Sequence, residues 1–421
     1  MKPIPFIGRI LCLWALSLAT ATAVQAQDRP KQDEFAQFEQ YRTGSAAVDA
    51  GAAEIFDRVA KYYAGRLSDP EVQRSGMSAL VQEFSRRLLL PPQHAYDRLS
   101  PQQKKFVDDF GKAMITQLEP LVLSNPKVIV RINAMRMGAE VAKMGYDGAA
   151  ELCVKALEKP DDVDSLAVKL YALKGLHNLF EIEPDKQVQP ARTIFQKKPD
   201  LQLTPLERKS ILALIGFIMR NPNLPPDAAS EEVDAVRYLR AEAVRALGRV
   251  RVQAVKNLGQ VEGRPALTLL KVARSDGMTP PTNVKERVEA IVGFAQLLPD
   301  RDRDLQVRYA VYHLGQALAE LADYKNSHPQ DTTIPWKVSA VRIRDALEHW
   351  RAEAENLKLD DARLIREFLD IANLNVLEAL AAGKEGSVPN VEALRAFLAN
   401  IDLAPTPSLF KSDPSTTLSV K

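Results

Sequence analysis

The chain has 421 residues, of which 46% are hydrophobic, 26% charged and only 6% aromatic. That length exceeds what one compact core supports, so it predicts two or three domains or one extended array. The formal charge is +2, and without Lys2 and Arg9 the remaining 54 basic residues face 54 acidic ones. This balance excludes the basic surface of a general nucleic-acid or membrane-surface binder, so we expect no nucleic-acid partner.

Residues 1–26 have the features of a secretory signal peptide. Lys2 and Arg9 form a basic start, a short apolar region follows from Ile10 to Ala19, and Val24 and Ala26 supply the small residues of a cleavage site. The alternative is an uncleaved membrane anchor, which needs about 20 apolar residues. The sequence therefore predicts cleavage after Ala26 and export to the periplasm or the exterior of a bacterial envelope. It predicts no membrane span in the mature chain.

Residues 27–45 are polar and predict a loosely ordered lead-in. From there to residue 400, apolar residues recur at helical spacing, and no run alternates as a strand does. Ser68, Ser100 and Thr204 each stand one or two residues before a proline and three residues before Glu or Gln. This arrangement is typical of a capped helix start, because the hydroxyl and the later side chain each satisfy a free backbone N–H.

Proline pairs, Asn-Pro steps and Gly383 separate the predicted helices. The residues between 184 and 199 predict a loop. The segment 404–421 is rich in Pro, Ser and Thr and predicts a disordered tail. The predicted helices cover residues 48–66, 70–90, 101–123, 127–144, 148–158, 163–182, 205–220, 231–248, 264–275, 283–298, 304–325, 335–357, 360–382 and 390–400.

A short pattern recurs at the start of several helix pairs. In its full form an aliphatic residue precedes a basic residue, and an alanine follows three positions later. The basic and alanine positions are Arg131 with Ala134, Lys169 with Ala172, Arg240 with Ala243 and, in a weaker version, Arg287 with Ala290. The step of 38 residues from Arg131 to Lys169 is close to the period of about 40 residues found in helical repeats.

This pattern resembles that of the HEAT-repeat family. The resemblance implies an all-α fold with no sheet, a right-handed α-solenoid of stacked antiparallel helix pairs over residues 46–400, clearest over 127–298. It also implies that the alanine allows close helix approach, and that the basic residue meets an acid or a helix C-terminus of a neighbouring repeat. The spacing is irregular, so an armadillo-like or mixed helical array remains an alternative.

The sequence predicts no catalytic, cofactor-binding or metal site, because it contains no nucleophile, phosphate-loop or metal motif. The run from Asp300 to Asp304 lacks the Gly and Glu of a calcium loop and predicts a solvated turn. His349 and Glu353 predict a surface pair on a charged helix rather than a metal site. Cys153, the one cysteine outside the leader, predicts a small core residue without a disulfide partner.

The sequence thus favours a non-enzymatic scaffold whose curved surface binds a protein or a peptide. This step rests on analogy with other helical arrays. Two further hypotheses stay open: a helical enzyme or ligand carrier with a pocket built from distant segments, and a structural subunit of an envelope assembly. Trp336 and Trp350, which are 14 residues apart, indicate either core packing or an exposed binding platform.

Overall fold

The computed structural model describes residues 29–418, apart from 91–98, 161–164, 181–202, 298–303 and 383–387 and the positions 223, 226, 251, 258, 259, 356 and 406. The predicted signal peptide, the predicted loop at 184–199, and Asp300 and Asp302 lie outside the described residues. The described chain is mostly helical, as its sequence predicts. It divides into two compact units, unit 1 up to Leu152 and unit 2 from Cys153 onward.

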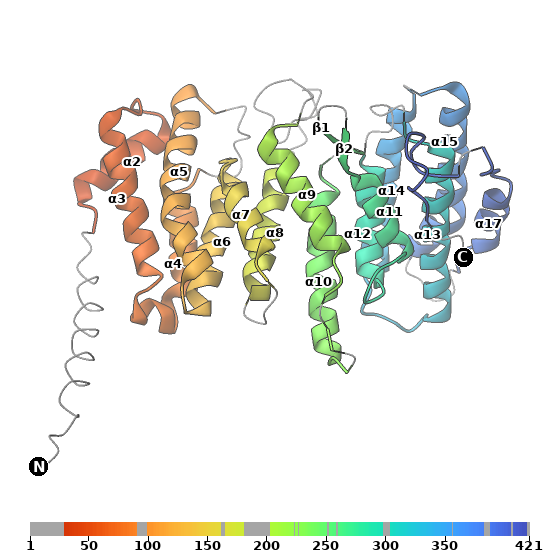
Figure 1. Ribbon diagram of the computed structural model, residues 1–421, viewed down its shortest axis with the longest axis horizontal. Helices are drawn as coiled ribbons and strands as arrows, with labels where there is room; N and C mark the ends of the chain where they lie inside the picture. The colour runs from red at the N-terminus through yellow and green to blue at the C-terminus, as the bar shows by residue number, and fades with distance from the viewer. Residues whose placement is uncertain are drawn as a thin grey trace, which may run out of the picture. The chain divides into compact units, whose positions relative to one another are not determined.

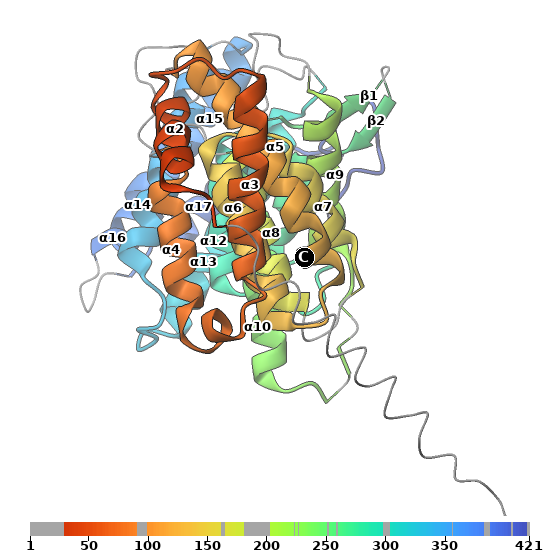
Figure 2. The same ribbon diagram turned by 90° about the vertical axis from the view of Figure 1, so that its left-hand side faces the viewer.

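Unit 1 is a group of helices in which α5 packs against both α3 and α6 (Figure 1). Helix α2 contacts α3 and α5, and α4 contacts α6 (Figure 2). Helix α7 crosses the division into unit 2. The bounds are α2 (Gln32–Thr43), α3 (Ala50–Arg66), the π-turn η1 (Val72–Gly76), α4 (Met77–Arg87), α5 (Pro101–Ser124), α6 (Val128–Met144) and α7 (Ala149–Glu158).

Aromatic side chains form the centre of unit 1. The ring of Phe38 meets those of Phe56, Phe106 and Phe110 edge-on, with centroids 4.9–5.8 Å apart. Such pairs add to the free energy gained by burying the rings. Phe38 and Tyr41 belong to α2, so the prediction of a loosely ordered lead-in is wrong for this helix. Its two buried aromatic residues pack this mostly polar helix against the core.

Two of the three predicted helix starts are confirmed in detail. Ser100 Oγ accepts from the N–H of Gln103, and the Gln103 side chain accepts from the N–H of Ser100. Thr204 and Glu207 exchange the same two bonds. The prediction at Ser68 is wrong, because Asp69 Oδ1 accepts from the N–H of Glu71 at 2.8 Å instead.

The contacts of unit 2 follow two rows of helices. Helices α8, α10, α12 and α14 touch in that order, and so do α9, α11, α13 and α15 (Figure 1). Successive helices such as α11 and α12 also pack against each other. The bounds are α8 (Leu166–Phe180), α9 (Pro205–Met219), α10 (Ser230–Leu247), α11 (Pro265–Arg274), α12 (Val284–Ala295), α13 (Val307–Ser327), α14 (Trp336–Ala354), α15 (Leu359–Ala372), the π-turn η4 (Asn373–Leu377), α16 (Glu378–Ala382) and α17 (Val391–Ala399).

One small sheet interrupts the helical chain between α10 and α11. Strands β1 (Val255–Asn257) and β2 (Gln260–Gly263) pair antiparallel, with Lys256 opposite Val261. The prediction of a fold without a sheet is therefore wrong at this point. Strands of three and four residues are too short to show a clear alternation of apolar and polar residues.

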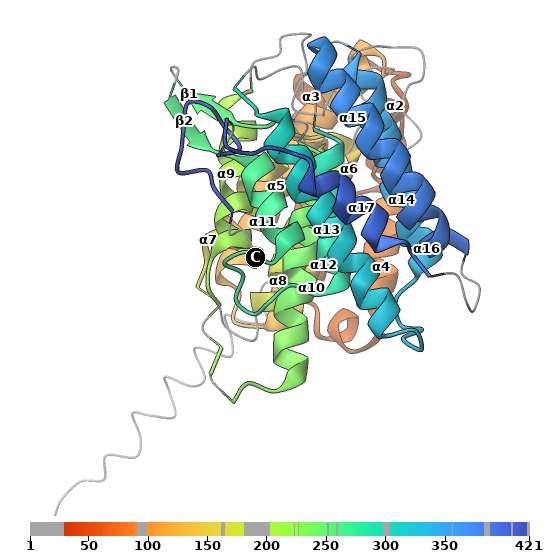
Figure 3. The same ribbon diagram turned by 90° about the vertical axis from the view of Figure 1, so that its right-hand side faces the viewer.

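The predicted disordered tail is also wrong for most of its described length. Leu409 and Phe410 are fully buried. The N–H of Gln306 donates to the carbonyl oxygen of Leu409 at 2.8 Å, and the N–H of Leu418 donates to Tyr309 Oη at 2.6 Å. Residues 407–418 therefore form a C-terminal strap across the start of α13 (Figure 3). Its few apolar residues are what hold it, despite a composition typical of disorder.

Within the described part of the chain, no helix combines the length and the hydropathy needed to cross a bilayer.

Candidate functional site

The four alanines of the recurring pattern lie in the core. Ala134 of α6 is fully buried, and so are Ala172, Ala243 and Ala290 of unit 2. A single methyl group at such a place fills little space, so neighbouring backbones can approach closely. Arg131, on the same helix as Ala134, is half-buried. The alanines are packing residues with no polar group to offer a ligand.

Two of the basic residues of the pattern bind helix ends or nearby carbonyl groups. Lys169 is fully buried, and its Nζ donates to the carbonyl oxygen of Lys159 at 2.6 Å. Arg287 Nε donates to the carbonyl oxygen of Ala273 near the end of α11, at 2.8 Å, and its guanidinium group pairs with Glu320. Both cations are thereby engaged inside the fold.

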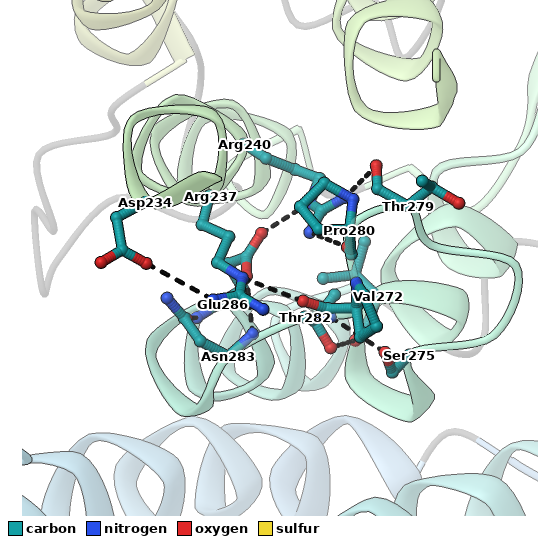
Figure 4. Close-up of polar contacts among 11 residues, drawn as sticks. Asp234, Arg237, Arg240, Val272, Ser275, Thr279, Pro280, Thr282, Asn283 and Glu286 are labelled. Atoms are coloured by element: carbon teal, nitrogen blue, oxygen red, sulfur yellow. Dashed lines mark hydrogen bonds and ion pairs between the residues drawn. The ribbon is translucent and has the colours of Figure 1, made fainter. Parts of the chain in front are cut away.

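Arg240 is the centre of a polar network in unit 2 (Figure 4). Its Nε lies 2.5 Å from Glu286 Oε1, and only 4% of the Arg240 side chain is exposed. Its two Nη atoms donate to the carbonyl oxygens of Thr279 and Pro280, at 3.3 and 2.7 Å. These bonds satisfy a cation that burial would otherwise make costly. They also hold α10 against the start of α12 and the segment before it.

The segment between α11 and α12 is organised by further bonds around this network (Figure 4). The N–H of Thr282 donates to Ser275 Oγ at 2.9 Å. Asn283 caps α12, because its Oδ1 accepts from the N–H of Glu286 while Glu286 Oε2 accepts from the N–H of Asn283. Burial raises the pKa of the Glu286 carboxyl group, and the hydrogen bond and charge of Arg240 oppose this rise.

A second buried carboxylate joins three helices nearby. Glu289 of α12 accepts two bonds from Arg342 of α14, at 2.8 and 2.7 Å, and one from Arg245 of α10, at 3.0 Å. Burial alone would raise the pKa of Glu289, but the bonds from Arg342 and Arg245 outweigh it and lower the pKa to about 2. The carboxylate is therefore fixed in its charged form and is unsuited to proton transfer near neutral pH.

An apolar pocket of about 420 Å³ lies beside Arg240 in unit 2. It is lined by the first residue of α8, the end of α9, the loop after α9 and the first half of α10. The apolar lining residues are Leu166, Phe217, Ile218, Pro222, Leu224, Pro225, Ala235, Val236 and Leu239. Arg240 also lines it, with its guanidinium group bound to Glu286. A volume of this size accepts an apolar side chain or a small molecule.

The charged residues around this pocket differ in their contacts. The guanidinium carbon of Arg220 lies 3.9 Å above the ring of Phe217, a cation–π contact that lies at the pocket itself. Glu231 and Glu232 of α10 are exposed at the pocket. Neither carboxylate forms an ion pair with a basic side chain in the part of the chain that the structure describes. With Arg240 paired to Glu286, two carboxylates and the Arg220 guanidinium group remain at the pocket, which is an excess of one negative charge.

The sequence did not predict this pocket. Pro222 and Pro225 stood out only as helix breakers, although with Leu224 they form an apolar wall. A loop between two helices that carries prolines and a leucine is a feature that could have indicated a rigid apolar surface. The other residues of the pocket come from segments as far apart in the chain as Leu166 and Leu239, and a single sequence does not show which of them meet.

Most of the other residues that the sequence singled out are buried or hydrogen-bonded within the fold. Cys153 is fully buried, and burial raises the pKa of its thiol to about 12. Trp336 and Trp350 are 6% and 1% exposed, so neither forms an open binding platform. Asp304 Oδ1 accepts from the N–H of Ser412 at 2.7 Å. His349 lies on α14, and the side chain of Glu353 is outside the described residues. Among the described residues, no three His, Cys, Asp or Glu side chains gather to hold a metal ion.

Comparison with known proteins gives no match: no model of a known protein family fits the chain, and no curated protein is similar to it in sequence.

Proposed function

We propose that this chain is an exported, non-enzymatic scaffold that binds a segment of a protein partner. In this proposal it is a right-handed α-solenoid of the HEAT or armadillo-like kind. The observation that carries the binding function is the apolar pocket between α9 and α10, with two exposed carboxylates at its edge. Among its described lining residues there is no His, Cys or Ser that could act as a nucleophile.

The rows of contacts in unit 2 support the repeat architecture. A helix that touches both the next helix and the next but one is typical of stacked helix pairs. The buried alanines Ala172, Ala243 and Ala290 of α8, α10 and α12 each follow a basic residue by three positions. Stacked pairs expose a continuous surface along each row, and such surfaces commonly bind extended protein segments.

The pocket indicates the chemistry of the bound segment. Its floor favours a large apolar side chain such as Leu or Phe, since burial of such a side chain contributes about 1.5–3 kcal/mol. Glu231 and Glu232 favour a basic residue next to that side chain. The proposed ligand is therefore a segment with an apolar anchor and an adjacent Lys or Arg.

Filling the pocket tests the proposal. Ala235 lines the pocket and is half-buried on α10. Ala235→Phe places a ring where the anchor of the partner would lie, so binding should fall by about tenfold or more. The measurement is affinity capture of the partner from the native envelope by the tagged protein, followed by titration of the captured partner.

Ala396→Phe is the matched control, because Ala396 is exposed on α17 and does not line this pocket. It should leave the affinity within about twofold. Circular dichroism confirms that both variants are folded. If Ala235→Phe bound the partner as well as Ala396→Phe does, the pocket would not be the binding site.

A second candidate function is the transport of a small apolar molecule. The volume of about 420 Å³ favours it, because pockets for small ligands commonly measure about 300–1,000 Å³. Organic extraction of the protein purified from its host, followed by mass spectrometry, distinguishes the two. A stoichiometric apolar molecule that is absent from Ala235→Phe would favour the carrier over the scaffold.

A further inference from the structure

A second concave surface belongs to unit 1, whereas the pocket described above belongs to unit 2. It has a volume of about 820 Å³ and is lined by residues before and along α2, by Tyr62 of α3 and by the last turns of α4. These elements face the viewer in Figure 2. We call it the basic groove, after five of its lining residues: Arg29, Lys31, Arg42, Arg86 and Arg87.

The charge of the basic groove is not balanced. Glu39 and Glu83 are its two acidic lining residues, against five basic ones. Glu39 holds Arg42, with Arg42 Nε 2.7 Å from Glu39 Oε2. Glu83 lies 3.8 Å from Arg87 Nη1. The groove therefore has three more basic than acidic side chains.

The remaining basic residues are free to meet a ligand. Arg29, Lys31 and Arg86 are exposed, and none pairs with a carboxylate in the ranges that the structure describes. They come from two separate walls, Arg29 and Lys31 before α2 and Arg86 from the end of α4. Guanidinium groups bind carboxylates through paired hydrogen bonds. Cations on two sides of the groove are therefore suited to hold an anionic ligand between them.

The groove is long and partly apolar. Its lining runs from Arg29 to Arg42, past the whole of α2, and a helix of 12 residues is about 18 Å long. An extended peptide of about five or six residues covers that distance. Phe35 and Tyr62 are half-buried in the same lining, so apolar surface lies between the cations.

We propose that the basic groove binds an acidic, extended peptide segment of a partner protein, with one apolar side chain set against Phe35 and Tyr62. Spread cations favour several carboxylates in a row over a single small anion, because a single phosphate or sulfate would need them to converge. The concave shape favours a peptide over a flat membrane surface. The ligand differs in charge from the one proposed for the pocket of unit 2, so the two sites take different segments.

The test uses the full mature chain and a fluorescein-labelled peptide of about seven residues, glutamates around one phenylalanine. Fluorescence anisotropy at about 0.02 M salt measures its dissociation constant, and a peptide with lysine in place of glutamate is the comparison. Arg86→Glu should weaken binding by about tenfold or more, because the change replaces an attraction by a repulsion. Salt at about 0.5 M should weaken it as well.

Arg74→Glu is the matched control. Arg74 is an exposed arginine of unit 1 in η1 and does not line the groove, so its reversal changes the net charge equally. It should leave the dissociation constant within about twofold. The proposal fails if the glutamate peptide binds no better than the lysine peptide, or if Arg74→Glu and Arg86→Glu weaken it equally. Displacement of the peptide by inorganic phosphate at equal concentration, or by vesicles of anionic lipid, would overturn it in favour of those anions.

Discussion

Unit 2 buries several ionisable side chains, and nearly all those described have a partner. His313 of α13 is different: it is fully buried, and neither ring nitrogen has a hydrogen-bond partner among the described residues. Its ring packs 4.3 Å from that of Tyr309. Burial and the nearby charge of Arg274 lower the pKa of His313 to about 4, and Asp276 opposes them only in part. The ring is therefore neutral across the range in which an exposed histidine gains a proton.

This histidine should make unit 2 less stable in mild acid. The unfolded chain takes up a proton near pH 6.5, whereas the folded chain does so only near pH 4. Between these values the unfolded state binds more protons, so the free energy of unfolding falls as the pH falls from about 6.5 towards 4, by at most about 3 kcal/mol. Melting temperatures recorded across that interval measure the loss.

His313→Phe removes the titrating group and should flatten that dependence. An equal slope in the parent and in His313→Phe would show that another group is responsible.

Glu289, whose pKa is lowered, affects the stability over a lower pH range than His313 does. Its stabilising effect is present above about pH 4.5 and is lost as the pH falls towards 2.

At the scale of helices, two glycines of unit 2 lie against each other where α10 meets α12. A Cβ atom on Gly293 of α12 would lie 2.7 Å from the Cα of Gly248, which ends α10. This distance is shorter than a carbon–carbon contact permits, so the two backbones meet only because both residues lack a side chain. In contrast, a Cβ on Gly216, inside α9, would meet no atom within 4 Å.

The two glycines should respond to alanine in opposite directions. Gly293→Ala should lower the free energy of unfolding by about 1–3 kcal/mol, because the α10–α12 contact has to open. Gly216→Ala should raise it by about 0.5–1 kcal/mol, because alanine restricts the unfolded chain and favours the helix. Chemical denaturation of both variants measures the change. Destabilisation of similar size at both sites would contradict the close packing at Gly293.

The helices themselves were largely predictable from sequence, because their ends carry local chemistry. The reciprocal bonds of Ser100 with Gln103 involve residues three positions apart, so they are visible in the chain order. The helix α2, the β1–β2 pair and the C-terminal strap were missed, since each depends on partners far away in sequence. Phe410, for example, is fully buried, although it belongs to a segment whose Ser, Thr and Pro content predicts disorder.

The candidate sites were not predictable in the same way. The recurring pattern places Arg240 on a helix, but the partners of its guanidinium group, Glu286, Thr279 and Pro280, lie about forty residues later in the chain. The pocket beside it and the basic groove are each assembled from three or more segments. Long-range assembly of this kind leaves no fixed spacing in one sequence, so motif searching does not find it.

For the whole molecule, a net charge of +2 conceals local imbalance. The basic groove gathers five cations against two carboxylates, while the buried carboxylates Glu286 and Glu289 of unit 2 each meet at least one arginine. The total therefore excludes a generally basic surface but not a local site for an acidic ligand. The charge of the leader is a separate matter, because Lys2 and Arg9 belong to a segment that we propose is removed.

Export should leave a chain that begins at Gln27. Cleavage after Ala26 follows from the basic start, the short apolar stretch and the small residues at the proposed site. Intact-mass measurement of the protein from its native host checks this, and the soluble envelope fraction should hold the shortened form. Recovery of the full-length mass from the membrane fraction would favour an uncleaved anchor.

The C-terminal strap has a consequence for the timing of folding. Leu418 bonds to Tyr309, which is 109 residues earlier in the chain. At about 5–20 residues per second, a ribosome makes the second partner roughly 5–20 s after the first. During that delay the start of α13 lacks the cover of Leu409 and Phe410, so unit 2 stays incomplete while most of its helices already exist. For that time the apolar start of α13 stays exposed, and the unfinished chain is open to aggregation until the strap is made.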